Sequence, residues 1–194
     1  MRAIPIILLC GVLAAPTLAQ RGALTVPQNI GQLSQRAGSI VRGQVVSVRV
    51  EPHPQLANLM TVVVSLRVTQ SFRGNPGALL TFRQFIWDIR DKYDAAGYRK
   101  GQDLLLLLNP VSSYGLTSPV GMDQGRFEIS RDVHGTLFAV NGVGNLGLFS
   151  KIAAPQISSK ISAASSSLVV RHRSGPVPLL QLEEIIQSSS GAAR

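Results

Sequence analysis

The chain has 194 residues, of which 45% are hydrophobic, and a formal net charge of +9 at neutral pH. This length suits one domain with a sizeable core and is too short for two such domains. The positive charge favours anionic partners, but its scattered positions favour the alternative that it only keeps the protein soluble. The single cysteine, Cys10, excludes an internal disulfide and a site built from several thiolates.

Residues 1–19 predict a secretory signal peptide. Arg2 supplies a positive start, an apolar stretch follows, and Thr17 and Ala19 are the small residues that precede a cleavage site. The apolar stretch is shorter than the roughly 20 residues that span a bilayer, so we expect cleavage near Ala19 rather than a retained anchor. The mature protein would then lie in the periplasm or outside the cell.

The first regular element of the mature chain is predicted to be a short amphipathic helix. Asn29 is a suitable N-cap, and the apolar residues that follow it recur at helical spacing: Ile30, Leu33 and Ala37.

Residues 39–50 predict a strand that changes its facing. Val41 and Val45 lie on one side of a two-residue alternation, whereas the later valines lie on the other side. A β-bulge near Gly43 would reverse the facing and increase the coiling of the strand. We therefore expect the two halves of this strand to contribute to different regions of a barrel interior.

Further strands are predicted where apolar residues alternate or form a short continuous run. They lie at residues 61–70, 78–87, 103–110, 125–131 and 136–141. Short strands separated by glycine- and proline-rich turns indicate a mainly β fold, and we predict a small five- or six-stranded OB-like barrel over residues 20–150.

The C-terminal part divides into two predicted segments. Residues 151–175 are rich in serine and alanine and predict a mobile linker. Residues 176–194 predict a helix and tail, and we expect the helix to dock its apolar face on the barrel. That face comprises Leu179, Leu182, Ile185 and Ile186.

Four segments together resemble an uncharacterised family of secreted bacterial proteins: "SIVRGQVVSVRV", "MTVVVSLRVTQSFRGNPGALLTFRQF", "KGQDLLLLLNP" and "DQGRFEIS". More distantly, their order resembles the netrin-like barrel of tissue inhibitors of metalloproteinases, a relative of the OB-fold in architecture. The resemblance implies a barrel. Those inhibitors chelate the zinc of a protease through an amino-terminal cysteine, which the mature chain lacks, so no functional residue carries over.

The sequence offers no recognised catalytic motif, because the G-x-S-x-G, H-E-x-x-H and P-loop patterns are all missing. Its three histidines lie in separate loop or tail segments and are interpreted as surface residues: His53, His134 and His172. We therefore predict no catalytic residue, no metal ligand and no cofactor.

Three aspartates recur at every third position, namely Asp88, Asp91 and Asp94. An EF-hand loop instead places acidic oxygens at alternate positions, with a central glycine and a closing glutamate. We interpret the aspartates as part of a solvated loop, and a weak calcium site is the remaining alternative.

Residues 82–101 mix aromatic and cationic side chains and form the candidate binding segment. Aromatic faces beside guanidinium groups can stack on sugars or bases while the cations meet phosphate or uronate. The alternative, which the interleaved aspartates favour, is that the aromatic residues form core and the charges solvate a loop. The candidate residues are Arg83, Phe85, Trp87, Arg90, Tyr93, Tyr98, Arg99 and Lys100.

Together these features predict an exported, non-enzymatic β-barrel module that binds an anionic polymer or a protein of the cell envelope, and we do not expect nucleic acid as its ligand. The alternative is a small extracytoplasmic hydrolase. Its site would be assembled from residues far apart in the sequence, namely His53, Asp88, Asp91 and His134.

Overall fold

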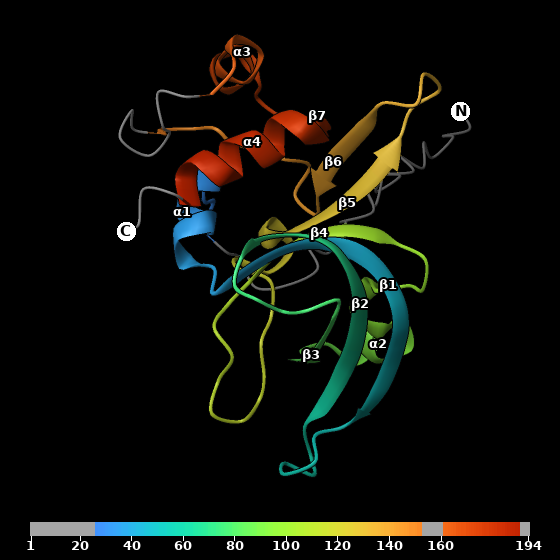
Figure 1. The fold of residues 1–194 in the computed structure, drawn as a ribbon. Helices are drawn as coiled ribbons and strands as arrows, with labels where there is room; N and C mark the ends of the chain where they lie inside the picture. Colours follow the sequence, from blue (N-terminus) through green and yellow to red (C-terminus); the bar gives the residue numbers. More distant parts are fainter. Residues whose placement is uncertain (1–25, 153–160, 191–194) are drawn as a thin grey trace, which may run out of the picture.

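The computed structural model describes residues 26–152 and 161–190, so the predicted signal peptide lies outside the described part. This part is mainly β, with a seven-stranded antiparallel sheet and four helices (Figure 1). The strands are β1 (Ser39–Pro52), β2 (Met60–Arg73), β3 (Leu79–Phe85), β4 (Asp103–Leu108), β5 (Arg126–Arg131), β6 (Leu137–Asn141) and β7 (Val177–Pro178). The helices are α1 (Ile30–Arg36), α2 (Ile89–Tyr93), α3 (Ala163–Arg171) and α4 (Leu179–Ser190), with 3-10 turns η1 (Ala95–Gly97) and η2 (Met122–Gly125).

The sheet has the strand order β3-β2-β1-β4-β5-β6-β7, which leaves β3 and β7 as its edges. The predicted mainly β class is confirmed, but the five- or six-stranded OB-like barrel is wrong, because the sheet has seven strands and is not closed. The long β1–β2 hairpin curls strongly (Figure 1). Two isolated bridges hold the chain that follows β4: Leu116 is bridged to Arg83 of β3, and Pro119 is bridged to Leu108 at the end of β4.

β1 contains the bulge that its valine pattern predicts. Val45 pairs with Leu66 and Ser47 pairs with Ser65, so β1 has one extra residue, Val46, at this point. The extra residue offsets the alternation. Valines on both sides of the bulge therefore face the same core: Val41, Val45, Val48 and Val50. The expectation that the two halves serve different regions is wrong.

Gly43 allows β1 and β2 to approach each other closely. A Cβ atom at this position would lie 2.2 Å from the carbonyl oxygen of Arg67 and 3.0 Å from Cγ of Leu66. Real Cβ atoms do not come so near to a backbone oxygen, so only glycine fits without moving β2.

Two hydrophobic cores lie on opposite faces of the sheet. The inner core, inside the curl, consists of Val41, Val45, Val62, Val64, Leu66, Phe82, Tyr98, Leu104, Leu106 and Leu108. The helix core, on the other face, includes Ile30, Leu33, Ile40, Leu105, Leu107, Phe127 and Ala139 together with residues of α4. Successive leucines of β4 point alternately into the two cores, which is the arrangement expected of a strand buried on both faces.

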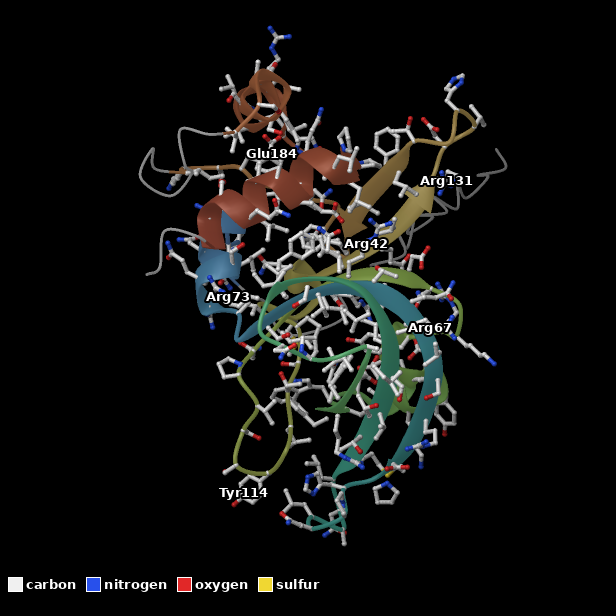
Figure 2. The ribbon with its side chains drawn as sticks, in the orientation of Figure 1. Arg42, Arg67, Arg73, Tyr114, Arg131 and Glu184 are labelled. Carbon is white, nitrogen blue, oxygen red and sulfur yellow. The ribbon has the colours of Figure 1, made fainter. Side chains whose placement is uncertain are left out.

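The predicted N-terminal helix is confirmed as α1. Asn29 caps it through a capping box with Gln32. At its other end Arg73 of β2 donates hydrogen bonds to the carbonyl oxygens of Ser34 and Ala37 (Figure 2). These bonds satisfy carbonyls that the helix itself leaves free.

The predicted docking of the C-terminal helix is also confirmed, although α4 packs on an open sheet. The four apolar residues of its predicted face are completely buried in the helix core: Leu179, Leu182, Ile185 and Ile186. α4 lies beside α1 and across from the β5–β6 hairpin (Figure 1).

Part of the predicted linker at residues 151–175 is helical. Residues 163–171 form α3, and residues 153–160 lie outside the described part. The side chain of Glu184 in α4 accepts hydrogen bonds from the Ser162 amide and from the hydroxyls of Ser162 and Ser165 (Figure 2). A serine-rich segment favours a flexible tether when it is considered alone. Here the carboxylate of the neighbouring helix α4 holds the serine residues at the start of α3 in place.

In residues 26–152 and 161–190, no helix is both long and apolar enough to cross a membrane.

A buried ion pair joins α4 to β1. A guanidinium nitrogen of Arg42 lies 3.3 Å from a carboxylate oxygen of Glu183, which is almost completely buried between the helix and the sheet (Figure 2 labels Arg42). Burial raises the pKa of Glu183, and the attraction of Arg42 offsets only part of that rise. The next residue behaves oppositely, since hydrogen bonds from Ser165 and Ser162 lower the pKa of Glu184.

We predict that Gly43→Ala destabilises the protein by more than about 2 kcal/mol, because the added methyl group collides with the β2 backbone. Urea unfolding followed by circular dichroism measures the change. Gln44→Ala, at the next position of β1, is the matched control and should change stability by less than about 0.5 kcal/mol. Equal effects of the two substitutions would contradict the role assigned to Gly43.

We predict opposite pH dependences for Glu183→Gln and Glu184→Gln. The pKa of Glu183 in the folded state lies above its unfolded value of 4.5. As pH rises from the unfolded to the folded pKa, ionisation of Glu183 therefore lowers the stability of the fold. Glu183→Gln should therefore gain stability relative to wild type between about pH 4 and pH 7. The pKa of Glu184 is lowered, so this residue stabilises the fold above pH 4.5, and the stabilisation is lost as pH falls through its folded-state pKa.

The measurement is the free energy of unfolding of both variants and of wild type across that pH range. Glu184→Gln should lose stability relative to wild type as pH rises. Parallel pH profiles for the two variants would show that burial does not distinguish these neighbouring carboxylates.

Candidate functional site

A cavity of about 500 Å³ opens between the end of β3, the segment that follows it and the turn that precedes β5. Its size falls in the range of small-ligand sites in proteins. The lining residues are Gln84, Phe85, Trp87, Asp88, Asp91, Asp94, Ala96, Gly97, Tyr98, Ser118, Pro119, Met122, Asp123 and Arg126.

One wall of the cavity is built by a chain reversal between β3 and β4. Asp88 caps the short helix α2 by accepting a hydrogen bond from the amide of Arg90. Ala95 and Ala96 then adopt positive φ angles of 53° and 54°, and Gly97 continues with 77°. This left-handed run turns the chain back, so that Tyr98 enters the inner core directly before β4.

Tyr98 forms the floor of the cavity. Its ring packs edge-on against Phe82, with the ring centroids 5.8 Å apart, and its hydroxyl donates a 3.0 Å hydrogen bond to Gln84. The guanidinium of Arg126 lies 4.9 Å from the centroid of the same ring, a cation–π contact. Burial raises the pKa of Tyr98 to about 12, although Arg126 opposes the rise.

The rim of the cavity carries two aromatic side chains. Phe85 and Trp87 pack edge to face with ring centroids 4.9 Å apart. Trp87 is nevertheless 69% exposed, so most of the indole surface remains available to a ligand. Large exposed aromatic surfaces beside a cavity are typical of binding sites.

The lining is acidic, although the chain as a whole is basic. Four aspartates line the cavity, and Arg126 is the one cationic residue in the lining. Arg126 is itself engaged, since it lies 3.4 Å from a carboxylate oxygen of Asp123 and donates a 2.6 Å hydrogen bond to the carbonyl of Ala96. The cavity therefore favours positive over negative ligand groups.

Three of the eight predicted binding residues line the cavity: Phe85, Trp87 and Tyr98. Arg83 lies outside it, where it bonds to Glu51 and to Thr61 at 2.7 Å each. Arg90 pairs with Asp88 across the start of α2. The other three candidates are outside the lining as well, namely Tyr93, Arg99 and Lys100.

Sequence reasoning missed the residues that the 118–126 segment contributes. Asp123 and Arg126 are distant from the candidate segment in sequence, and only the pairing of Arg126 with Leu106 brings them to the cavity. Gly125, between them, makes this possible because a Cβ there would lie 2.5 Å from the carbonyl oxygen of Val120. The sequence shows glycine at that position but not which strand it approaches.

The histidines do not join this site, since none is among the described residues that line the cavity. The interpretation of His53 as a surface residue is wrong, because it is buried and accepts a hydrogen bond from the Gln55 amide while its other ring nitrogen meets the carbonyl of Tyr114. His134 is exposed in the β5–β6 turn, and His172 is half-buried against Phe149. Asp88 and Asp91 therefore line the cavity without His53 or His134 beside them.

Metal binding has little support from the donor geometry. In the parts of the chain that the structure describes, no three side chains of His, Cys, Asp or Glu are grouped so that they could hold a metal ion. The spacing of Asp88, Asp91 and Asp94 along α2 instead places them around the cavity wall.

The chain matches no protein-family model, no curated protein and no solved structure. The resemblance to secreted netrin-like barrels therefore stays a prediction.

We predict that Tyr98→Phe destabilises the protein by about 1 kcal/mol near pH 9, because Gln84 loses its hydrogen-bond donor. The folded-state pKa of about 12 exceeds the ordinary value of 10.0, so wild type loses stability as pH rises between these two values. The variant lacks this contribution, and the difference between the two proteins should shrink toward pH 11.5.

Urea unfolding at several alkaline pH values measures that difference. The control is Tyr93→Phe, since Tyr93 is 84% exposed and should show neither effect. A constant difference between wild type and Tyr98→Phe would contradict the assignment of the raised pKa.

Proposed function

We propose that this protein is an exported, non-enzymatic binding module whose cavity receives a positively charged group of an envelope protein or polymer. The observation that carries the proposal is one cavity of about 500 Å³ that combines an exposed indole at its rim with a carboxylate-rich wall. Export rests on the predicted signal peptide at residues 1–19.

The aromatic rim supports a cationic ligand group. The face of tryptophan attracts ammonium and guanidinium groups more strongly than the other aromatic faces do. Phe85 holds the Trp87 ring from one side, at a centroid distance of 4.9 Å, and leaves the rest of the indole exposed. The indole therefore has one ring contact within the protein and an open face on which a ligand group can stack.

The charges of the lining support the same choice. Asp91 and Asp94 contribute negative charge to the lining that also includes the indole, and Asp123 offsets the charge of Arg126. An anionic polymer would meet these carboxylates on entering. The net charge of the whole chain favoured an anionic ligand. A ligand in the cavity meets the charges of the lining instead, and these favour a cationic group.

The hydrolase alternative gains no support from this lining. General acid–base catalysis requires a proton-transfer group within reach of the reacting atoms, and histidine is the usual one. Asp88 and Asp91 line the cavity without a histidine among the lining residues.

The test titrates Trp87 fluorescence with N-acetylarginine amide and with its uncharged citrulline counterpart, which has nearly the same shape. We expect the arginine compound to bind at least tenfold more tightly, which corresponds to about 1.4 kcal/mol. The double variant Asp91→Asn/Asp94→Asn should lose this preference, because the ring contact remains and the charges are gone.

The matched control is Asp103→Asn, an exposed aspartate at the start of β4 that is not part of the lining. It should keep the full preference for the charged compound. Equal affinities of wild type for the arginine and citrulline compounds would contradict the proposal, and so would an equal loss in the control variant.

A further inference from the structure

Two loops meet at one end of the curled sheet and form a single tip. The tip consists of residues 52–60, which connect β1 to β2, and residues 110–118, which follow β4 (Figure 1). His53 joins the loops, since its Nε2 lies 2.9 Å from the carbonyl oxygen of Tyr114 and its Nδ1 accepts a hydrogen bond from the Gln55 amide. The buried imidazole therefore fixes one loop against the other.

The surface of the tip carries no charge and combines exposed hydrophobic side chains with the exposed polar residues Gln55, Asn58, Ser112 and Ser113. Its exposed large side chains are Leu56, Val111 and Tyr114, with exposed fractions of 37%, 68% and 55%. Figure 2 shows Tyr114 at the end of its loop. Neither loop contains Lys, Arg, Asp or Glu, although 15% of the whole chain is charged. Exposed tyrosine and aliphatic side chains without neighbouring charges are a feature of surfaces that dock on membranes or on other proteins.

Many backbone groups of the tip are satisfied within it. In the first loop the amides of Leu56 and Leu59 donate to the carbonyls of His53 and Leu56. In the second loop the amide of Gly115 donates to the carbonyl of Ser112, and the Ser112 amide donates to Leu116. These bonds would persist on transfer of the tip to a less polar medium, which lowers the cost of desolvating the groups that form them.

Cationic side chains lie directly behind the tip. Arg49 and Arg83 are both paired across the sheet with Val63, and they share one carboxylate, Glu51. One positive charge therefore remains at this level. Arg49 lies three residues before Pro52, which places it about 10 Å behind the start of the tip at the usual strand rise.

We propose that the tip inserts into the interface of a bilayer that contains anionic phospholipid. Interfacial insertion reaches about 5 to 10 Å into the headgroup and acyl boundary, so an inserted tip leaves Arg49 outside that boundary, on the side of the headgroups. Tyr114 then lies at the depth where tyrosine is enriched in membrane proteins, and Arg49 meets the anionic headgroups. This inference rests on the tip alone and does not depend on a ligand in the cavity.

The experiment measures co-sedimentation of the protein with vesicles of phosphatidylcholine alone or mixed equally with phosphatidylglycerol. Wild type should bind the mixed vesicles, and Leu56→Asp/Tyr114→Asp should reduce the partition coefficient at least tenfold. Val133→Asp is the matched control, because Val133 is 94% exposed in the β5–β6 turn, away from the tip. It should bind as wild type does.

Fluorescence locates the contact independently of sedimentation. In a Trp87→Phe background, Tyr114→Trp should shift its emission to the blue on mixed vesicles and be quenched by brominated lipid, whereas Val133→Trp should do neither. Arg49→Gln should weaken binding to mixed vesicles without changing binding to pure phosphatidylcholine.

Three results would overturn the inference. The first is an absence of wild-type binding to mixed vesicles, and the second is equal binding by wild type and the Leu56→Asp/Tyr114→Asp variant. The third is a wild-type dimer, seen by sedimentation velocity, that this variant dissociates, since the tip would then be an interface between copies of the chain. Circular dichroism of each variant confirms that it is folded.

Discussion

The structure depends on one strand that is buried on both of its faces. All five leucines of β4 are essentially inaccessible to solvent, and they alternate between the inner core and the helix core. Each core alone would be small, and burial of a leucine stabilises a fold by about 1.5 to 3 kcal/mol. By supplying side chains to both, β4 lets one sheet hold a curled half and a helix-covered half together.

This shared strand also positions the cavity. Tyr98 enters the inner core a few residues before β4, and Arg126 begins the strand that pairs with β4 at Leu106. The contact of 4.9 Å between the guanidinium and the tyrosine ring therefore depends on the register that places Arg126 and on the core packing that places Tyr98. A site built in this way is preformed, because backbone pairing holds Arg126 and core packing holds Tyr98 before any ligand binds. Its rim at Trp87 is held more loosely, by one ring contact with Phe85.

Local sequence patterns predicted much of the fold. The features that depend on pairing between distant strands could not be predicted from them. The capping signal at Asn29, the parity change around Val46 and the apolar face of α4 each appear within a few residues, and each is found in the structure. Whether the sheet closes is decided by pairing between distant strands, which local patterns do not show. The predicted barrel was therefore wrong. The cavity shows the same limit: Phe85, Trp87 and Tyr98 belong to one segment, whereas Asp123 and Arg126 reach it only through the β4–β5 register.

The central claim is that β4 couples the two cores into one cooperative unit, and equilibrium unfolding with two probes tests it most directly. Trp87 is the only tryptophan and reports on the curled half, whereas far-ultraviolet circular dichroism at 222 nm is dominated by helices, which lie mainly on the other half. The account predicts that the fluorescence and dichroism transitions in urea superimpose at one midpoint. Two separate midpoints would contradict it, because each half would then unfold without the other.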